Sequence, residues 1–459
     1  MNMKSAYAVA ATALLVVASA TTTRPAIAAS NAWFLEQTLV PQQAENAAQF
    51  GFAVHANGNE LAIGTPYADA NGLIDNGEVE VWRRPAGAWT FSERVAPELG
   101  PFEGAYAGSA VAIDADRLYI GSPSYDQPSV NRGAVELFEY VSGGWNQFAG
   151  IGGREGDRTG AAIAYDHALI AIGLPGPCTS GCSVSERGGR VFVSYDAADV
   201  TQYGVIVPDP GSDGNNDGFG VSVAVYRSPD PAQPDLLVVG APLRHIDGAG
   251  DLAGAVYVYA NATHDASDWQ PVAYLTAENG AASDLFGYSV AVGPSRIVVG
   301  APFRDRVIPT PVSNAGAVFV FTPDGSGGWQ QESQLFLANA ATNELFGDTV
   351  AYDLTHDRVF GGAPQRFDTV FGGSGATGSV TVFKRTLIIP PNFGWLAIAE
   401  LFSDDQLSIG QQAGRAVSVS GDRIFVGAPT YDANPNNGIV DSGRVLVFSA
   451  DEIFGNGFD

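Results

Sequence analysis

Apolar and polar positions alternate along almost the whole chain, in short runs that end at glycine, proline, aspartate or asparagine. Runs of about four to eight residues with this two-residue period, rich in valine, isoleucine and aromatic residues, are typical of β-strands. After the N-terminal segment 1–28, no stretch shows the longer apolar period of a helix. The pattern therefore predicts an all-β protein.

The strand-like runs recur as a phrase in three parts. A clear copy reads Phe219–Val225, then Leu237–Pro242, then Gly254–Tyr259. The first part opens with Phe-Gly and the second closes on Gly-Ala-Pro. Seven copies follow one another, with leading glycines at 51, 108, 160, 220, 287, 347 and 414; the first, second, third and seventh copies depart from the motif, as in Gly64-Thr65-Pro66 and Ala107-Gly108. A fourth run, led by an aromatic residue such as Trp269, precedes most copies, so each unit contains four strands.

Four short antiparallel strands form a sheet that cannot bury both its faces, so the units must stack on one another. Radial stacking of such sheets gives a β-propeller, which has about four to eight blades. The repeat predicts a seven-bladed β-propeller of four-stranded antiparallel blades over residues 29–450. Small residues such as Ser222 and Ala224 suit strands that crowd a central axis. Glycine in Gly-Ala-Pro allows close backbone approach, and the phenylalanine of Phe-Gly fills the wedge between sheets.

The three-part phrase resembles the FG-GAP repeat of integrin α subunits and of many secreted bacterial proteins, from Trp33 to Phe448. This resemblance implies a propeller that binds protein or carbohydrate ligands through its loop faces. In several integrin repeats an Asp-x-Asp-x-Asp-Gly-x-x-Asp loop between the first two strands holds calcium. Here Asn57–Asn59 is a tight turn, and Ser228–Asp235 has the length without the alternation of acids. The calcium sites of the family are therefore not carried over.

Other loops carry oxygen-bearing side chains at spacings that suit calcium, which takes six to eight oxygen ligands. One loop matches the first half of a calcium loop, and two more follow a Gly-x-Pro step. The candidate ligands are Asp213, Asn215 and Asp217; Asp69, Asn71 and Asp75; and Asp432 and Asn434. Aspartate, asparagine and glycine also form turns without any metal. Calcium is the one cofactor that the sequence suggests, and turn formation is the alternative.

The composition of the chain limits which partners it can bind and which reactions it can catalyse. The chain has 49 acidic and 23 basic residues and a formal net charge of −26, which argues against nucleic acid. Its five histidines are scattered, with no nucleophile motif beside them. We therefore expect a non-enzymatic ligand-binding or adhesion module for protein or carbohydrate. A secreted hydrolase or lyase that uses carboxylates brought together by the propeller is the alternative, and a structural part of a surface assembly is a third.

The contacts with a ligand are expected in the long loops that follow the Gly-x-Pro steps, because loops on a rigid scaffold carry recognition. Aromatic and acidic side chains there combine stacking with contacts to ions or hydroxyl groups. The candidate residues are Tyr67, Asp69, Tyr125, Asp126, Tyr431 and Asp432.

The two ends of the chain suggest export. Lys4, the apolar run Ala6–Ala18 and the small residues before Ala28 are typical of a signal peptide, 1–28, cleaved after Ala28. The apolar run is too short to span a membrane, so we expect a secreted or cell-surface protein without a transmembrane segment. The C-terminal tail, 451–459, is either a sorting or docking peptide or packs on the last blade through Ile453 and Phe454.

Export also affects the two cysteines, since disulfides persist outside the cytosol. Cys178 and Cys182 flank a three-residue spacer that contains glycine, and we expect a local disulfide between them. A zinc site would need two more ligands nearby, and the surrounding sequence supplies neither cysteine nor histidine for it.

Overall fold

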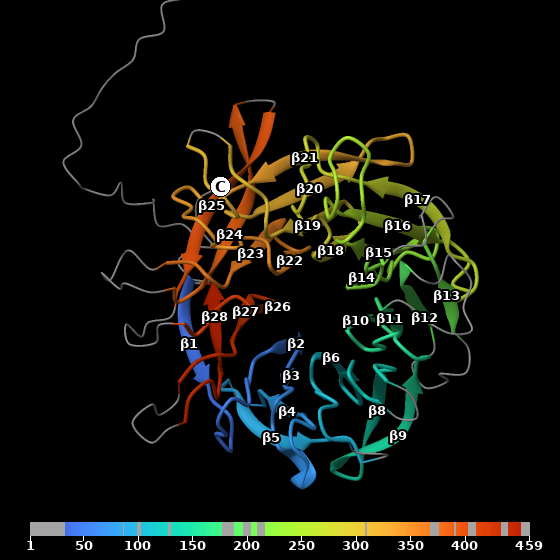
Figure 1. The fold of residues 1–459 in the computed structure, drawn as a ribbon, viewed down its shortest axis with the longest axis vertical. Helices are drawn as coiled ribbons and strands as arrows, with labels where there is room; N and C mark the ends of the chain where they lie inside the picture. Colours follow the sequence, from blue (N-terminus) through green and yellow to red (C-terminus); the bar gives the residue numbers. More distant parts are fainter. Residues whose placement is uncertain are drawn as a thin grey trace, which may run out of the picture.

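Seven small sheets form a closed ring in the computed structural model (Figure 1). The structure describes residues 33–85, 87–98, 102–126, 130–176, 188–195, 203–208, 216–307, 310–367, 376–389, 392–402, 410–432 and 439–450. Each sheet has four antiparallel strands. A single turn of 3-10 helix, η1 (Ala70–Gly72), is the helical element in these ranges. The predicted all-β class and the seven-bladed propeller are confirmed.

The strands are numbered along the chain, and each blade runs from an innermost to an outermost strand. The blades are β2 (Ala53–Asn57), β3 (Glu60–Thr65), β4 (Glu78–Arg83) and β5 (Thr90–Val95); β6 (Ala110–Asp114), β7 (Arg117–Ser122), β8 (Ala134–Val141) and β9 (Gly144–Gly152); β10 (Ala162–Asp166), β11 (Leu169–Leu174), β12 (Arg190–Ser194) and β13 (Gly204–Ile206); β14 (Ser222–Tyr226), β15 (Asp235–Ala241), β16 (Ala255–Asn261) and β17 (Gln270–Leu275); β18 (Ser289–Gly293), β19 (Arg296–Ala301), β20 (Ala317–Pro323) and β21 (Trp329–Leu335); β22 (Val350–Asp353), β23 (Arg358–Ala363), β24 (Ser379–Ile389) and β25 (Asn392–Leu401); and β26 (Ala416–Ser420), β27 (Arg423–Ala428), β28 (Arg444–Ala450) and β1 (Trp33–Leu39). We call these blades 1 to 7 in that order.

The ring closes because the first strand of the propeller completes the last blade. β1, the first strand described, pairs with β28 as the outer strand of blade 7, with Trp33 opposite Ala450 and Leu39 opposite Val445. Figure 1 shows β1 in blue beside β28 in red. Every aromatic-led run therefore belongs to the blade before the Phe-Gly strand that follows it, and the sequence unit starts one strand earlier than the blade. The pairing of β1 with β28 ties the two ends of the propeller together.

Glycines set the spacing between neighbouring blades. A Cβ built on Gly64, at the end of β3, would lie 2.0 Å from the carbonyl oxygen of Gly108 in blade 2. All seven blade junctions repeat this contact, with values between 2.0 and 2.2 Å. The Phe-Gly glycines have φ near +90°, as Gly108 does at +91°, a region that glycine enters without steric cost. The expectation that glycine permits close backbone approach is confirmed.

Phenylalanine fills the wedge between blades, as expected. Phe286 is fully buried and packs with Val256 and Val258 of blade 4 and with Phe319 of its own blade, its ring centroid 5.2 Å from that of Phe319. Small residues serve the same junctions, because the hydroxyl of Ser222 donates to the carbonyl oxygen of Gly287 in the next blade at 2.8 Å. The core is thus a series of wedges shared by neighbouring blades.

Buried ion pairs hold the loops on the face of the ring where β3, β7 and their equivalents end. Nη1 of Arg304 lies 2.6 Å from Oδ2 of Asp284, two residues before the Phe-Gly step of blade 5. The pairs Arg244–Asp217 and Arg366–Glu344 occupy the same positions in blades 4 and 6. In each, the arginine stands two residues after a Gly-Ala-Pro proline. Each ion pair thus ties the loop that follows Gly-Ala-Pro to the loop that precedes Phe-Gly in the same blade.

Among the described residues, no helix has the length and apolar character that crossing a membrane requires. The predicted signal peptide, 1–28, the C-terminal tail, 451–459, and both cysteines of the predicted disulfide lie outside the described residues.

Candidate functional site

A funnel occupies the centre of one face of the ring, and every blade contributes to its lining at one equivalent position. The contributing residue directly follows the Phe-Gly glycine, at the entrance of the innermost strand. A cavity of about 580 Å³ is lined by all seven such residues: Phe52, Ser109, Ala161, Val221, Tyr288, Asp348 and Arg415. The seven backbones are equivalent while the seven side chains differ. The fold therefore gathers seven variable positions around one space.

The floor of the funnel is apolar. Side chains on a strand alternate between faces, so the residue two positions further on points the same way, about 7 Å deeper. These residues line a continuation of about 240 Å³ and are all β-branched and aliphatic: Val54, Val111, Ile163, Val223, Val290, Val350 and Val417. A ligand that enters the funnel thus meets polar walls first and an apolar ring below.

One side of the funnel is bulky and charged. Nη1 of Arg415 lies 2.8 Å from Oδ2 of Asp348, and its guanidinium stands 5.3 Å from the ring centroid of Phe52. Burial raises the pKa of Asp348, and the nearby charge of Arg415 acts in the opposite direction. Arg415 is thus neutralised within the wall. The other side, blades 2 to 4, has only Ser109, Ala161 and Val221 at the equivalent positions, which leaves that half wider.

The rim above the wider half carries tyrosine and arginine. Tyr106 and Arg158 stand directly before Ala107-Gly108 and Thr159-Gly160, which replace Phe-Gly in blades 2 and 3. Both residues have left-handed conformation, with φ of 56° and 55°, and both line the cavity. The rings of Tyr67 and Tyr106 are 4.9 Å apart. Burial, followed by the neighbouring Tyr106, raises the pKa of Tyr67, so its hydroxyl stays protonated. Arg158 is exposed, and its guanidinium has no partner in the described part of the chain.

Of the tyrosines predicted to contact a ligand, Tyr67 lines the funnel and the other two pack elsewhere. Tyr125 meets the ring of Phe102 at 6.0 Å, and the ring of Tyr431 lies 3.9 Å beneath the guanidinium of Arg444. Neither is among the described residues that line the cavity. The structure thus separates Tyr67 from Tyr125 and Tyr431.

The aspartates predicted to contact a ligand beside these tyrosines form hydrogen bonds within their own loops. An oxygen of Asp69 accepts a hydrogen bond from the backbone N–H of Asp75 at 3.1 Å, and Asp432 accepts one from Asp441 at 2.9 Å. Asp126 accepts one from Asn131 in the same way at 2.5 Å. The donor residue has positive φ in each loop. One oxygen of each aspartate is therefore used at the base of the loop.

The predicted calcium ligands that the structure describes also have protein partners. Asn71 donates its side-chain N–H to the carbonyl oxygen of Pro97 at 3.0 Å, and Asp217 pairs with Arg244. Burial and then the charge of Asp69 raise the pKa of Asp75. Asp213, Asn215 and Asn434 lie outside the described residues. Within the described ranges, no three or more of His, Cys, Asp and Glu are grouped to hold a metal ion.

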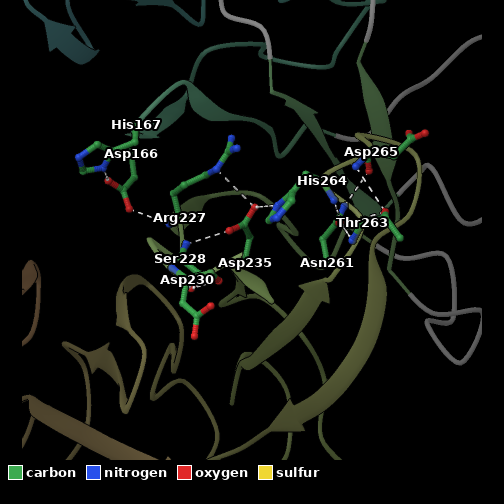
Figure 2. A network of polar contacts seen from close by, with 10 residues as sticks. All are labelled: Asp166, His167, Arg227, Ser228, Asp230, Asp235, Asn261, Thr263, His264 and Asp265. Carbon is green, nitrogen blue, oxygen red and sulfur yellow. Dashed lines mark hydrogen bonds and ion pairs between the residues drawn. The ribbon is translucent and has the colours of Figure 1, made fainter. Parts of the chain in front are cut away.

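The β14–β15 hairpin, the one with the length of the family's calcium loop, is held by side chains instead (Figure 2). Asp235 is fully buried, and its carboxylate lies 2.8 Å from both the backbone nitrogen of Ser228 and Nδ1 of His264. Nε of Arg227 adds a contact at 3.7 Å, and its backbone N–H donates to Asp166 of blade 3 at 2.7 Å. Protein donors thus satisfy the carboxylate of this hairpin.

Two parts of the site escaped the sequence analysis. The position after the leading glycine could be read as variable, because Phe, Ser, Ala, Val, Tyr, Asp and Arg replace one another there between otherwise similar strands. The arginines of the buried pairs recur as Gly-Ala-Pro-x-Arg in three copies. The direction in which each of these side chains points became known only from the ring.

The seven four-stranded units define a seven-bladed β-propeller. The model of the FG-GAP repeat matches residues 269–321, from the outer strand of blade 4 through the third strand of blade 5. The chain is 27% identical to chicken (Gallus gallus) integrin alpha-6 over 171 residues, which are 37% of this chain and 15% of the integrin. It is 31% identical to human integrin alpha-7 over 182 residues, 38% of this chain and 14% of the integrin. The matches thus cover about one seventh of each integrin, and the recognition of an integrin-like FG-GAP propeller is confirmed.

Proposed function

We propose that this protein is an exported, non-enzymatic propeller that binds an extracellular protein or carbohydrate ligand in its central funnel, as an adhesion-type module does. One observation carries the proposal: seven different side chains, one from the same position of each blade, line a single cavity. Concave sites with a few convergent polar groups are the usual location of ligands. The similarity to integrin α subunits supports a binding role.

The described lining of the funnel favours binding over hydrolysis. Asp348 is the one carboxylate among the described lining residues, and it is paired with Arg415. A carboxylate-dependent hydrolase needs two carboxyl groups that flank the scissile bond. The hydrolase alternative would gain support from turnover of any substrate that a single carboxylate substitution abolishes.

Binding to an immobilised panel of glycans and peptides tests the funnel. We expect Tyr67→Ala to weaken capture of the bound panel members at least tenfold, because it removes a ring and a hydroxyl from the wall. The double variant Tyr125→Ala/Tyr431→Ala is the matched control, since it removes two loop tyrosines outside the cavity. The opposite ranking would move the site to the loops that carry Tyr125, Asp126, Tyr431 and Asp432.

Calcium assistance is a separate part of the proposal. Its support is the oxygen-rich sequence of the loops at 69–75, 213–217 and 432–434. Thermal unfolding with excess EGTA and with calcium chloride tests it. We expect calcium to raise the unfolding midpoint and Asp432→Asn to reduce that rise. Identical midpoints in the two solutions would contradict calcium binding.

A further inference from the structure

We infer that the funnel takes a short saccharide that carries a carboxylate, with Arg158 as the residue that binds the carboxylate. This inference rests on the proposed binding function and names the class of ligand. Among the described residues, the funnel offers one cation without an acidic partner, a set of tyrosine rings and several hydroxyl groups in one cavity of about 580 Å³. Each of these features narrows the chemistry of the occupant.

The positive charge of Arg158 at the rim of the funnel indicates that the ligand is an anion. The protein has a net charge of −26, and most of its described arginines are paired with acids, as Arg304 and Arg366 are. Arg158 differs because its side chain lines the funnel with no partner in the described ranges. A guanidinium matches a carboxylate with two parallel N–H···O bonds. An arginine left free in a protein so acidic is therefore a specific place for a negative group.

The number of charges limits the ligand to few carboxylates. The second arginine of the lining, Arg415, is already neutralised by Asp348. In the part of the chain that the structure describes, a phosphate with two charges, or a long polyanion, would meet one unpaired cation in the funnel and then the field of the acidic protein. A single carboxylate on an otherwise neutral molecule fits this balance.

The remaining lining indicates a sugar. Tyr67, Tyr106 and Tyr288 offer ring faces for the C–H faces of a pyranose, and each has a hydroxyl at its edge. Ser124 and Thr349 add hydroxyl groups that both donate and accept, while Ser109, whose hydroxyl donates to the carbonyl oxygen of Tyr106 at 2.7 Å, adds an acceptor. A peptide anchor usually needs an apolar pocket, whereas the apolar residues here lie deeper in the funnel. Tyrosine rings and hydroxyl groups in the same cavity as Arg158 suit a uronic acid residue.

The shape of the funnel places the acid sugar over the wider half. At the position after the leading glycine, blades 2 to 4 carry only Ser109, Ala161 and Val221, while the other blades carry the larger Tyr288, Asp348, Arg415 and Phe52. The carboxylate then lies at the rim beside Arg158, and the ring of the sugar lies against Tyr106 and Tyr67. The aliphatic ring that includes Val111 and Ile163 lines the continuation of the cavity beneath.

Isothermal titration of the full chain with a trisaccharide that contains a single uronic acid residue tests the inference, with its methyl ester as the matched neutral probe. We expect the acidic trisaccharide to bind at least tenfold more tightly than the ester. Arg158→Gln should remove that preference by weakening binding of the acidic trisaccharide about 10- to 100-fold, while Arg158→Lys retains part of it. Gln412→Ala is the control, because Gln412 holds the same left-handed position in blade 7 and is outside the described lining of the cavity.

The possible failures are distinguishable. Equal affinity for the acid and the ester, lost in Tyr67→Ala and kept in Arg158→Gln, would overturn the carboxylate inference and leave the funnel as the binding site. Binding of a capped tripeptide with one aspartate in place of the saccharide would overturn the ligand class. Absence of any saccharide binding would overturn the inference about the ligand. The proposal that the funnel is the binding site would be contradicted only if Tyr67→Ala left every panel interaction unchanged. Because Arg158 is exposed, its variants should keep the thermal midpoint of the parent.

Discussion

Gly64 and Gly108 lie so close that no other pair of residues fits between blades 1 and 2. A Cβ on Gly64 would stand 2.0 Å from the carbonyl oxygen of Gly108, against backbone that has no side chain to move aside. The N–H of Gly108 meanwhile donates to the carbonyl oxygen of Gly121 in its own blade at 3.1 Å. The same contact at every junction sets how tightly seven blades close around the funnel.

Gly64→Ala should therefore destabilise the protein strongly. We expect a loss of about 3 kcal/mol or more in the free energy of unfolding, because the methyl group forces two blades apart. The control is Gly58→Ala in the same blade, where φ is +59° and no atom lies within 4 Å of the added methyl; its left-handed backbone costs about 1 kcal/mol. Denaturant unfolding of both variants measures the difference. Equal losses would show that the close approach is not what limits the junction.

The pairing of β1 with β28 leads to a second prediction. Leu39 of β1 is 1% exposed and packs in the core shared by blades 7 and 1, whereas Phe34 of the same strand is 50% exposed. Leu39→Ala should cost about 2–5 kcal/mol and should raise amide exchange in β28, its partner strand. Phe34→Ala should change both quantities little. Faster exchange confined to a blade other than blade 7 would contradict the role of β1 as the closing strand.

A third prediction concerns the buried pair of Arg304 and Asp284. Oδ2 of Asp284 also accepts a hydrogen bond from the backbone N–H of Ala281 at 2.7 Å. Arg304→Met leaves a buried carboxylate without its cation and should cost about 3 kcal/mol. Adding Asp284→Asn removes the charge and keeps an acceptor for Ala281, so the double variant should recover most of the loss. Unfolding curves of the two variants test this, and additive losses would argue against a charge effect.

The sequence was sufficient for the fold because its information is local and repeated. Phe-Gly and Gly-Ala-Pro mark strands whose ends need glycine, and copies of such a unit leave few ways to stack. The site was harder to predict for a physical reason. Tyr67 and Tyr431 follow similar motifs, yet one lines the funnel and the other lies beneath Arg444. The partners that separate them come from other blades, and only the closed ring brings them together.

Two buried glutamates give the last prediction, on pH. Glu80 and Glu136 stand at the same position of β4 and β8, and burial raises the pKa of each to about 7, from an ordinary value of 4.5. The folded protein then binds more protons than the unfolded chain between about pH 4.5 and 7, so their effect is to lower the free energy of unfolding as pH rises through that window. The carboxyl group of Glu136 meets the hydroxyl of Ser122 at 2.9 Å, and this hydroxyl is also able to accept.

Glu136→Gln should therefore fit the site as the protonated acid does. We expect it to leave stability unchanged at pH 4 and to raise the free energy of unfolding at pH 8 by about 3 kcal/mol, the equivalent of the shift. Glu80→Gln is the contrasting variant, because both oxygens of Glu80 accept, from the N–H groups of Gln42 and Trp82, and an amide opposes one of them. Denaturant unfolding from pH 4 to 8 measures both. A difference between Glu136→Gln and the parent that does not change with pH would show that Glu136 ionises normally in the folded state.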